Sequence, residues 1–332
     1  MSPVLSVLDL SPVSGTESQA QAIRDTLEVA KAAERLGYHR FWVAEHHNMG
    51  TLGSAAPEIL MAALSQVTRT IRLGSGGVML VNYSPLKVAE VFMELEALAP
   101  GRIDLGVGRA LGTDSRTGGA LRSAGSEAFP HYFALLSAWL LDAAGVEPIT
   151  DAHPARDIHA SPSGPSHPDM FLLCSSPDSA AFAGQAGVGM VYAEFIARSE
   201  GAPSTAAYRQ AFAPSVFRQT PWASVATIAL AAETREEAER LAAPMRAGAL
   251  ANLDNERRRF PTIDEAQSFL DARRDDPRLP GVLARAIVGS AAEVRAGLED
   301  KARKAGADEL FVMAVGPSLE TRIRSLELIK GL

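Results

Sequence analysis

Short apolar runs alternate with helix-spaced apolar positions along the first third of the chain. Between Glu17 and Leu36, the residues Ile23, Leu27 and Ala30 recur at the spacing of one helix face. The pattern predicts strands over Val4–Leu10, Arg40–Ala44, Ile71–Leu80 and Arg102–Val107, and helices over Glu17–Leu36, Pro57–Val67 and Pro85–Leu98. This alternation is typical of βαβ units and a parallel sheet.

The same alternation returns in the second half of the chain. It predicts strands over Met170–Cys174, Val188–Tyr192, Trp222–Ala231 and Glu309–Val315, and helices starting at Ser179 and covering Arg235–Ala247, Ala291–Ala305 and Leu319–Leu328. Eight strand–helix units fit a closed barrel better than an open sheet. We therefore expect an α/β protein with a (β/α)8 TIM barrel, forming a single domain over residues 1–332.

Two stretches interrupt the alternation, one after the fourth strand and one after the seventh. Ala143–Pro168 is rich in Pro, Ser, Gly and His, and Asn252–Gly281 is strongly charged, with Arg257-Arg258-Arg259 and Arg273-Arg274. Long irregular segments in compact domains are often functional lids. Solvated surface insertions explain them equally well.

Composition narrows the class of protein. The 332 residues are 47% hydrophobic, and the formal net charge is −7, so nothing suggests a surface for nucleic acid. The single cysteine, Cys174, excludes an internal disulfide and fits a reducing compartment. No apolar stretch is long enough to span a bilayer, and the first residues lack the pattern of a signal peptide. We expect a cytoplasmic protein.

The second predicted strand ends in titratable groups, Glu45-His46-His47. Neighbouring residues on a strand point to opposite faces, so His46 shares its face with Trp42, and Glu45 shares the other with His47. The two histidines cannot easily bind one metal ion, and the chain lacks the ligand spacings of a zinc site, so we expect no metal. His46 suits acid–base or hydrogen-bonding chemistry near neutral pH. A polar strand cap with structural hydrogen bonds is the alternative.

Glycines occupy the third strand at Gly74, Gly76 and Gly77. A glycine inside a strand often marks the close approach of another group. A flat cofactor ring could rest there against bare backbone. A bulge or tight packing inside the barrel would also explain these glycines.

Two further segments could bind an anion. Arg109 follows the fourth strand, and a guanidinium suits a phosphate or an anionic ring, although a salt bridge to a neighbouring loop is the alternative. Its glycine-rich surroundings do not have the spacing of a dinucleotide-binding loop. Ser175, Ser176 and Ser179 follow the fifth strand, where hydroxyls and a helix N-terminus can hold phosphate. An ordinary helix N-cap is the alternative, and Cys174 fits a core residue.

Taken in order, these motifs resemble the bacterial-luciferase-like flavin monooxygenases. The shared segments are Ala44-Glu45-His46-His47, the Gly-Ser-Gly-Gly-Val-Met-Leu run, the Pro-Gly-Arg-Ile-Asp-Leu-Gly-Val-Gly-Arg run and the Ser-Ser turn. The opening Leu-Ser-Val-Leu-Asp-Leu-Ser-Pro-Val is similar to the single-chain, alkanal-monooxygenase-like subgroup. The similarity is strong over residues 4 to 125 and weaker over 170–240 and 287–330.

The resemblance implies a TIM barrel that binds reduced FMN supplied by a separate NAD(P)H:flavin reductase. O2 would add to the flavin to give a peroxyflavin, which oxidises an aldehyde or another small organic substrate. His46 resembles the family's essential histidine, and Gly76-Gly77 resembles a pair whose peptide bond is cis beneath the flavin ring. Arg109, Ser176 and Ser179 resemble phosphate ligands, whereas Ser175 replaces an acid of luciferase. We group these residues and Glu45 as the expected cofactor site.

The resemblance also implies a mobile loop between strands seven and eight, so we expect Asn252–Gly281 to act as a lid over the site. It further suggests a homodimer through the early helices. Two other functions stay open at this point. One is a deazaflavin-dependent dehydrogenase of the same superfamily, and the other is a non-catalytic flavin-binding protein, which would not need a titrating group such as His46.

Overall fold

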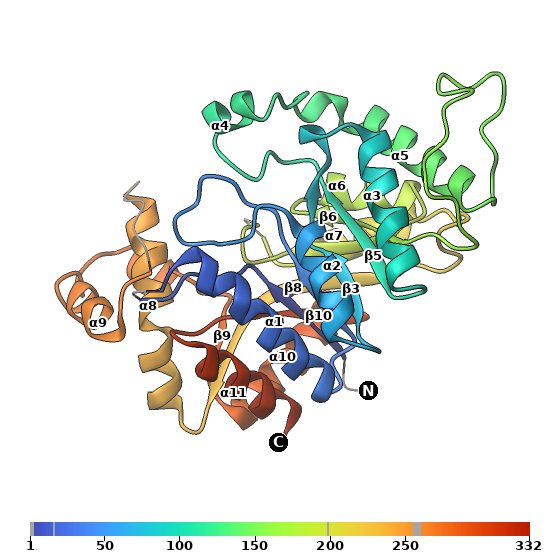
Figure 1. Ribbon diagram of the computed structural model, residues 1–332. Coiled ribbons are helices and arrows are strands. Elements are labelled where there is room, and N and C mark those ends of the chain that lie inside the picture. Colours follow the sequence, from blue (N-terminus) through green and yellow to red (C-terminus); the bar gives the residue numbers. More distant parts are fainter. Residues whose placement is uncertain (1–2, 16, 198, 255–259) are drawn as a thin grey trace.

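A closed barrel of eight parallel strands forms the centre of the computed structural model, which describes residues 3–15, 17–197, 199–254 and 260–332 (Figure 1). The pairing order is β10-β1-β2-β3-β5-β6-β7-β8, and pairing of β10 with β8 closes the ring. The barrel strands are β1 (Val4–Asp9), β2 (Arg40–Val43), β3 (Arg72–Ser75), β5 (Ile103–Gly108), β6 (Asp169–Cys174), β7 (Gly189–Ala193), β8 (Ala223–Ala232) and β10 (Glu309–Ala314). The predicted TIM barrel is confirmed, because each of the eight predicted strands contributes one barrel strand.

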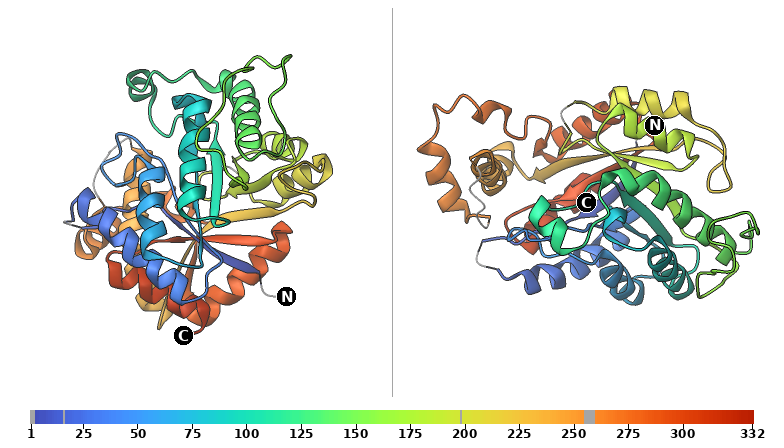
Figure 2. Two further views of the ribbon diagram at one scale, coloured as in Figure 1. Left: turned by 45° about the vertical axis from the view of Figure 1, so that its right-hand side comes forward. Right: turned by 90° about the horizontal axis from the view of Figure 1, so that it is seen from above.

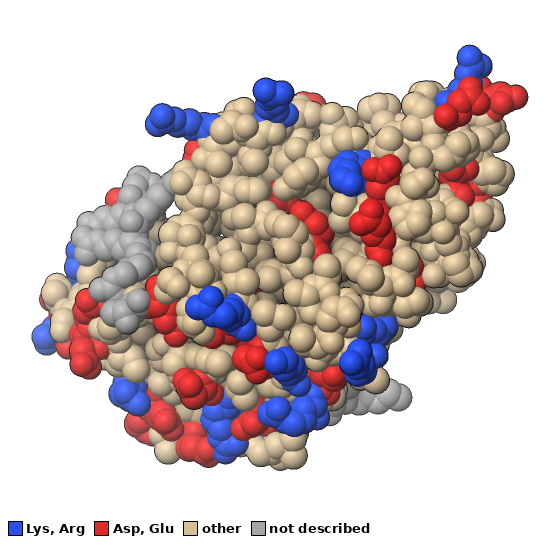
Figure 3. Space-filling view, viewed as in Figure 1, with Lys and Arg blue, Asp and Glu red and all other residues tan. Residues whose placement is uncertain are grey.

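Helices surround the barrel, and most of them pack an apolar face against it, whereas α9 packs on α8 (Figure 2). They are α1 (Gln19–Arg35), α2 (Pro57–Val67), α3 (Pro85–Leu98), α4 (Ser115–Ala120), α5 (Phe129–Ala143), α6 (Pro177–Gln185), α7 (Ala202–Ala211), α8 (Arg235–Leu253), α9 (Ile263–Asp271), α10 (Ala291–Ala305) and α11 (Leu319–Lys330). Polar and charged side chains cover their outer faces. In Figure 3, charged side chains of both signs gather over α1 and α11, where ion pairs such as Lys31–Glu28 form.

The structure differs from the predicted elements at several places, including the helices α4, α5 and α7, which the sequence did not predict. The strand expected over Ile71–Leu80 is divided into β3 and the short β4 (Val78–Met79), with the break at Gly76-Gly77. An unpredicted strand, β9 (Ile287–Ser290), pairs with the carboxyl half of β8. The stretch expected to be irregular over Asn252–Gly281 contains α9, which starts with a capping box between Thr262 and Glu265. Arg257-Arg258-Arg259 lie outside the described residues.

The barrel interior is filled by large apolar side chains around Trp42. Its indole ring lies 5.0 Å from the ring of Phe171 and 4.5 Å from that of Phe311, measured between centroids. A Cβ atom at Gly74 would lie only 2.2 Å from Nε1 of Trp42, and one at Gly106 would lie 2.1 Å from the Ser75 carbonyl oxygen. Tight packing inside the barrel therefore accounts for these two glycines.

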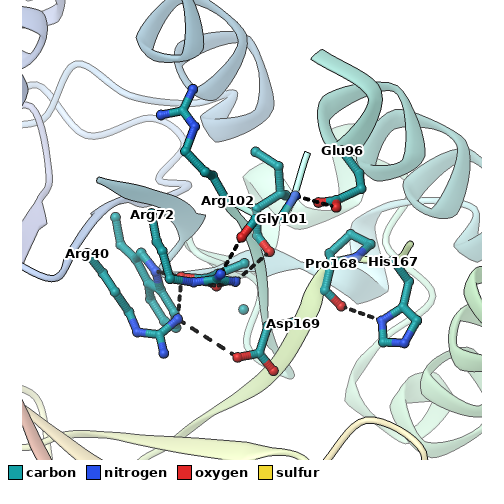
Figure 4. Close-up of polar contacts among 12 residues, drawn as sticks. Arg40, Arg72, Glu96, Gly101, Arg102, His167, Pro168 and Asp169 are labelled. Carbon is teal, nitrogen blue, oxygen red and sulfur yellow. Dashed lines mark hydrogen bonds and ion pairs between the residues drawn. The ribbon is translucent and has the colours of Figure 1, made fainter. Parts of the chain in front are cut away.

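A group of buried and partly buried charged residues, the amino-end charge cluster, lies at the amino ends of the barrel strands. Asp104 accepts hydrogen bonds from Arg40 Nη1 at 2.7 Å, Arg72 Nε at 2.9 Å and Trp42 Nε1 at 2.9 Å. Figure 4 shows Arg40 turned towards Asp169, with 3.9 Å between Nη1 and Oδ2. The members of the cluster are Arg40, Arg72, Asp104, Asp169, Arg218 and Glu309. In TIM barrels this end serves stability, and catalysis takes place at the carboxyl end.

The two insertions lie at different ends of the molecule (Figures 1 and 2). Residues 143–168 connect α5 to the start of β6, so they belong to the amino end of the barrel. Ser166 Oγ donates to Glu96 Oε1 at 2.7 Å there, and Trp139 Nε1 donates to the carbonyl oxygen of Ile158 at 3.0 Å. By contrast, Leu283 and Ala286, which follow α9, pack against the apolar cluster of the barrel interior.

Candidate active site

His46 follows the carboxyl end of β2, where the chain leaves the barrel wall. Its backbone N–H donates to the carbonyl oxygen of Ser54 at 3.0 Å, which fixes the turn. The side chain is partly buried, and Nδ1 is a buried atom without a hydrogen-bond partner in the described structure. Burial, with a smaller effect of the neighbouring His47, lowers the pKa of His46 to about 4. The imidazole is therefore neutral at pH 7.

Glu45 is fully buried on the other side of the strand end. Its carboxylate accepts hydrogen bonds from the Met79 backbone N–H at 2.8 Å, Asn82 Nδ2 at 3.1 Å and Tyr83 Oη at 3.0 Å, and it lies 2.7 Å from His47 Nε2. The contact between Glu45 and His47 agrees with the alternation expected from the sequence. These protein contacts tie the end of β2 to residues 79–83.

The Gly76-Gly77 peptide bond is cis, as the resemblance implied. The backbone N–H of Gly76 donates to the Val43 carbonyl oxygen at 2.7 Å, which places the bond beside the end of β2. A Cβ atom at Gly76 would lie 2.8 Å from Leu8 Cδ1, and one at Gly77 would lie 2.7 Å from Leu173 Cδ2. Only bare backbone therefore fits at this position.

Arg109 and the Ser175–Ser179 turn lie at the ends of the adjacent strands β5 and β6. Ser176 is the N-cap of α6 and forms a capping box with Ser179, whose Oγ accepts from the backbone N–H groups of Ser175 and Ser176 at 3.3 and 3.2 Å. The structure thus shows the N-cap that the sequence offered as one explanation. Arg109 and Ser175 are exposed.

The thiol of Cys174 connects these two segments electrostatically. Burial raises the pKa of Cys174 to about 12, against the opposing effects of a hydrogen bond from Ser179 and the positive charge of Arg109. Cys174 itself is a buried core residue, as expected, and its thiol is protonated at pH 7.

A cavity of about 540 Å³ opens beside the carboxyl end of β7 and the middle of β8. Sequence reasoning missed most of its lining outside the stretch Asn252–Gly281, although one signal was present: Glu194 follows a predicted strand end, as Glu45 does. The remaining lining comes from the end of α8 and the segment before β9. The lining residues are Glu194, Phe195, Thr227, Ile228, Ala249, Leu253, Arg278, Gly281, Val282, Leu283, Ala284, Arg285 and Ala286.

Comparison with known proteins identifies the family. The family model for luciferase-like monooxygenases matches residues 4–309 of the chain. The chain belongs to the luciferase-like monooxygenase family. This match confirms the resemblance found in the motifs, and the relatives below confirm the prediction of an enzyme of the monooxygenase class.

Named relatives of this luciferase-like monooxygenase cover most of its length. A luciferase-like monooxygenase of Escherichia coli is 36% identical over 327 residues, covering 97% of this chain and 95% of the relative. The N-acetyl-S-alkylcysteine monooxygenase of Bacillus subtilis is 40% identical over 244 residues, covering 71% and 70%. The crystal structure of apo-MsnO8 is 36% identical with a TM-score of 0.89, covering 99% and 97%.

More distant structures share only the fold. One is the oxygenating constituent of 3,6-diketocamphane monooxygenase from Pseudomonas putida in complex with FMN, at 18% identity and a TM-score of 0.72 over 99% of this chain and 97% of that one. Another is an F420-dependent secondary alcohol dehydrogenase, at 16% identity and a TM-score of 0.69 over 100% and 98%. The fold alone therefore does not select between the two cofactors.

Within the described ranges, no three His, Cys, Asp or Glu side chains converge as metal ligands. In the same part of the chain, no helix has the length and apolar character needed to cross a membrane.

Proposed function

We propose that this luciferase-like monooxygenase uses reduced FMN and O2 to oxygenate an aldehyde or another small organic substrate. When bound, reduced FMN supplies two electrons to O2, so that one oxygen atom enters the substrate and the other leaves as water. For an aldehyde, the products are the carboxylic acid, oxidised FMN and water. The main support is a neutral, partly buried His46 with an unpartnered Nδ1 at the carboxyl end of the barrel.

The residues present fit such a cofactor. Gly76 and Gly77 present backbone without side chains beside the end of β2, where a flat ring can lie against it. Arg109 and the turn that begins α6 combine a guanidinium with a helix N-terminus, two features that bind phosphate. We propose that Arg109, Ser175, Ser176 and Ser179 hold the phosphate and that the glycine pair lies against the ring.

We assign different tasks to His46 and Glu45. A neutral imidazole can donate one hydrogen bond and accept another, so His46 can bind an oxygen atom and move a proton at its ring nitrogens. Glu45 was grouped with the cofactor site, and its carboxylate is engaged by Met79, Asn82, Tyr83 and His47. We propose that Glu45 acts as a positioning residue that fixes the strand end from which His46 projects.

We also propose a lid over the site, a homodimer and a reductase partner. The family resemblance suggests that residues 252–281 act as a lid, and Leu253, Arg278 and Gly281 already line the cavity at the carboxyl end of the barrel. Protection of this segment from trypsin by reduced FMN tests the lid.

Exposed Ile59 and Val67 on α2 and Leu98 on α3 support a homodimer through the early helices, which sedimentation analysis tests. A separate NAD(P)H:flavin reductase would supply the reduced flavin.

A deazaflavin-dependent dehydrogenase is the second candidate function, and the shared fold of the alcohol dehydrogenase favours it. Anaerobic fluorescence titration with FMN, with the deazaflavin cofactor and with riboflavin separates the candidates. We expect FMN to bind more tightly than either of the others, because riboflavin lacks the phosphate that Arg109 would bind. Stronger binding of the deazaflavin would overturn the proposal.

Substitution Arg109→Met sharpens this titration. Loss of one charge-assisted hydrogen bond costs about 1.5–3 kcal/mol, so FMN affinity should fall by roughly 10-fold to 150-fold. Riboflavin affinity should stay unchanged, because that ligand carries no phosphate. The exposed Arg122→Met serves as the control and should leave both affinities unaltered. An equal loss for both ligands would place Arg109 elsewhere than at the phosphate.

A further inference from the structure

The cavity beside β7 and β8 contains none of the residues assigned above to FMN or to proton transfer. Its volume of about 540 Å³ lies in the range of small-molecule sites. Its walls come from four elements: the residues after β7, the middle of β8, the end of α8 and residues 278–286. The cavity is therefore a second binding volume at the carboxyl end of the barrel.

Apolar side chains make the cavity continuous with the barrel interior. Phe195, Ile228, Leu283 and Ala286 line the cavity, and each also belongs to, or packs against, the apolar cluster around Trp42. His46 and Gly76-Gly77 follow strands on the other side of the same barrel opening. An apolar molecule in this cavity would thus face the same barrel opening as the proposed flavin site.

Two of the charged residues in the lining have counter-charges from the protein. Glu194 is buried, and its carboxylate forms an ion pair with Lys301 of α10 and accepts a hydrogen bond from Thr227 at 3.4 Å. Arg278 lies 2.6 Å from Asp254 and 2.7 Å from Asp276, measured between nitrogen and oxygen atoms. Neither residue leaves an uncompensated charge for a ligand.

Arg285 differs from both. Its side chain is partly buried, and one Nη atom donates to the backbone carbonyl oxygen of Ala197. Among the residues that the structure describes, no carboxylate pairs with it. A guanidinium has five N–H donors in a planar fork, and that fork matches a carboxylate. Within the described residues, the cavity therefore has apolar walls and one positive charge, that of Arg285, without a carboxylate beside it.

We propose that this cavity is the substrate site, and that it takes a small molecule with an apolar body and one carboxylate, which Arg285 binds. Calling this molecule a substrate rests on the proposed function, the oxygenation by reduced FMN and O2. Binding at the cavity is nevertheless independent of any flavin. The apolar body would lie along Phe195 and Ile228, and the carboxylate would lie at Arg285.

Calorimetric titration of the flavin-free protein tests the proposal with two matched probes, octanoate and octanamide. We expect octanoate to bind the wild-type protein at least about tenfold more tightly, the ratio that one charge-assisted pair typically supplies. Arg285→Gln should abolish that preference, and Arg285→Lys should keep part of it. Ala249→Trp, which fills the cavity, should weaken both probes.

Arg274→Gln is the matched control, because Arg274 is an exposed arginine of the preceding insertion and does not line the cavity. It should keep the wild-type preference, and thermal unfolding checks that each variant is folded. Equal affinity for the two probes, a preference that survives Arg285→Gln, or no binding of either probe would each overturn the proposal. If the FMN titration fails while the octanoate preference holds, the proposed function is wrong and the anion-binding cavity stands.

Discussion

At the scale of single residues, burial controls the chemistry of the site. His46 and Glu45 are adjacent in sequence, yet their environments differ. The carboxylate of Glu45 has four protein partners, whereas Nδ1 of His46 has none within the described structure. A buried polar atom without a partner is costly, so it indicates a position prepared for a ligand or for chemistry.

The lowered pKa of His46 makes stability depend on pH. The imidazole titrates at about 4 in the folded protein and at 6.5 when unperturbed, so the unfolded chain binds the extra proton first as pH falls. Stability is therefore full above pH 6.5 and declines between 6.5 and 4. Urea unfolding at pH 7 and pH 5 should show that His46→Gln reduces this decline.

The exposed His131→Gln provides the control for that measurement. It should leave the difference in stability between pH 7 and pH 5 as in the wild-type protein. An identical decline in His46→Gln and wild type would mean that the imidazole is not buried in a neutral form.

At the scale of elements, the ends of strands and helices position the proposed site. The turn after β6 shows how a single residue can serve both structure and binding. Ser176 caps α6 by accepting a hydrogen bond from the backbone N–H of Ser179 at 3.3 Å. The sequence offered a cap and a phosphate ligand as alternatives, and one serine can fill both roles.

Ser176→Ala should therefore have two separable effects. Loss of the N-cap costs about 1 kcal/mol of stability. Ser318 caps α11 in the same way by accepting from Thr321 at 3.2 Å, so Ser318→Ala should cost a similar amount. Only Ser176→Ala should also weaken FMN binding in a fluorescence titration. If both variants bind FMN equally well, the α6 turn does not hold the phosphate.

The elements also show what the sequence could and could not predict. Barrel strands were predictable because they are buried on both faces and read as apolar runs. The strand β9 was missed because it is four residues long and only partly buried, and α9 was missed because charge dominated the local pattern. Phe195 and Arg285 were missed because long-range packing brings their segments together. The lining of the cavity therefore required the structure.

At the scale of the whole molecule, the barrel has one end for stability and one for chemistry. The amino-end charge cluster links five of the eight barrel strands through Arg40, Arg72, Asp104, Asp169 and Glu309. Asp104 is fully buried at the centre of this arrangement. The carboxyl end instead carries His46, Gly76-Gly77, Arg109 and the cavity.

Asp104→Asn tests this division of labour. Removing one partner from a buried ion pair leaves the other charge uncompensated and costs about 3–5 kcal/mol. Urea unfolding should report a loss of that size, whereas Asp300→Asn, at an exposed pair with Lys304, should leave the free energy of unfolding nearly unchanged. FMN affinity of the folded Asp104→Asn protein should be unchanged. A selective loss of FMN binding would contradict the assignment of this end to stability.

The account depends most directly on His46 acting on a bound reduced flavin, and stopped-flow mixing of reduced FMN with O2 tests this claim. We expect the wild-type protein to delay the return of the oxidised FMN absorbance relative to free reduced FMN. His46→Ala should bind FMN with similar affinity, but the delay should become shorter by at least about tenfold. This is a conservative figure, because one acid–base group usually changes a rate by more than that. A wild-type protein that causes no delay, or a variant that retains it in full, would contradict the account.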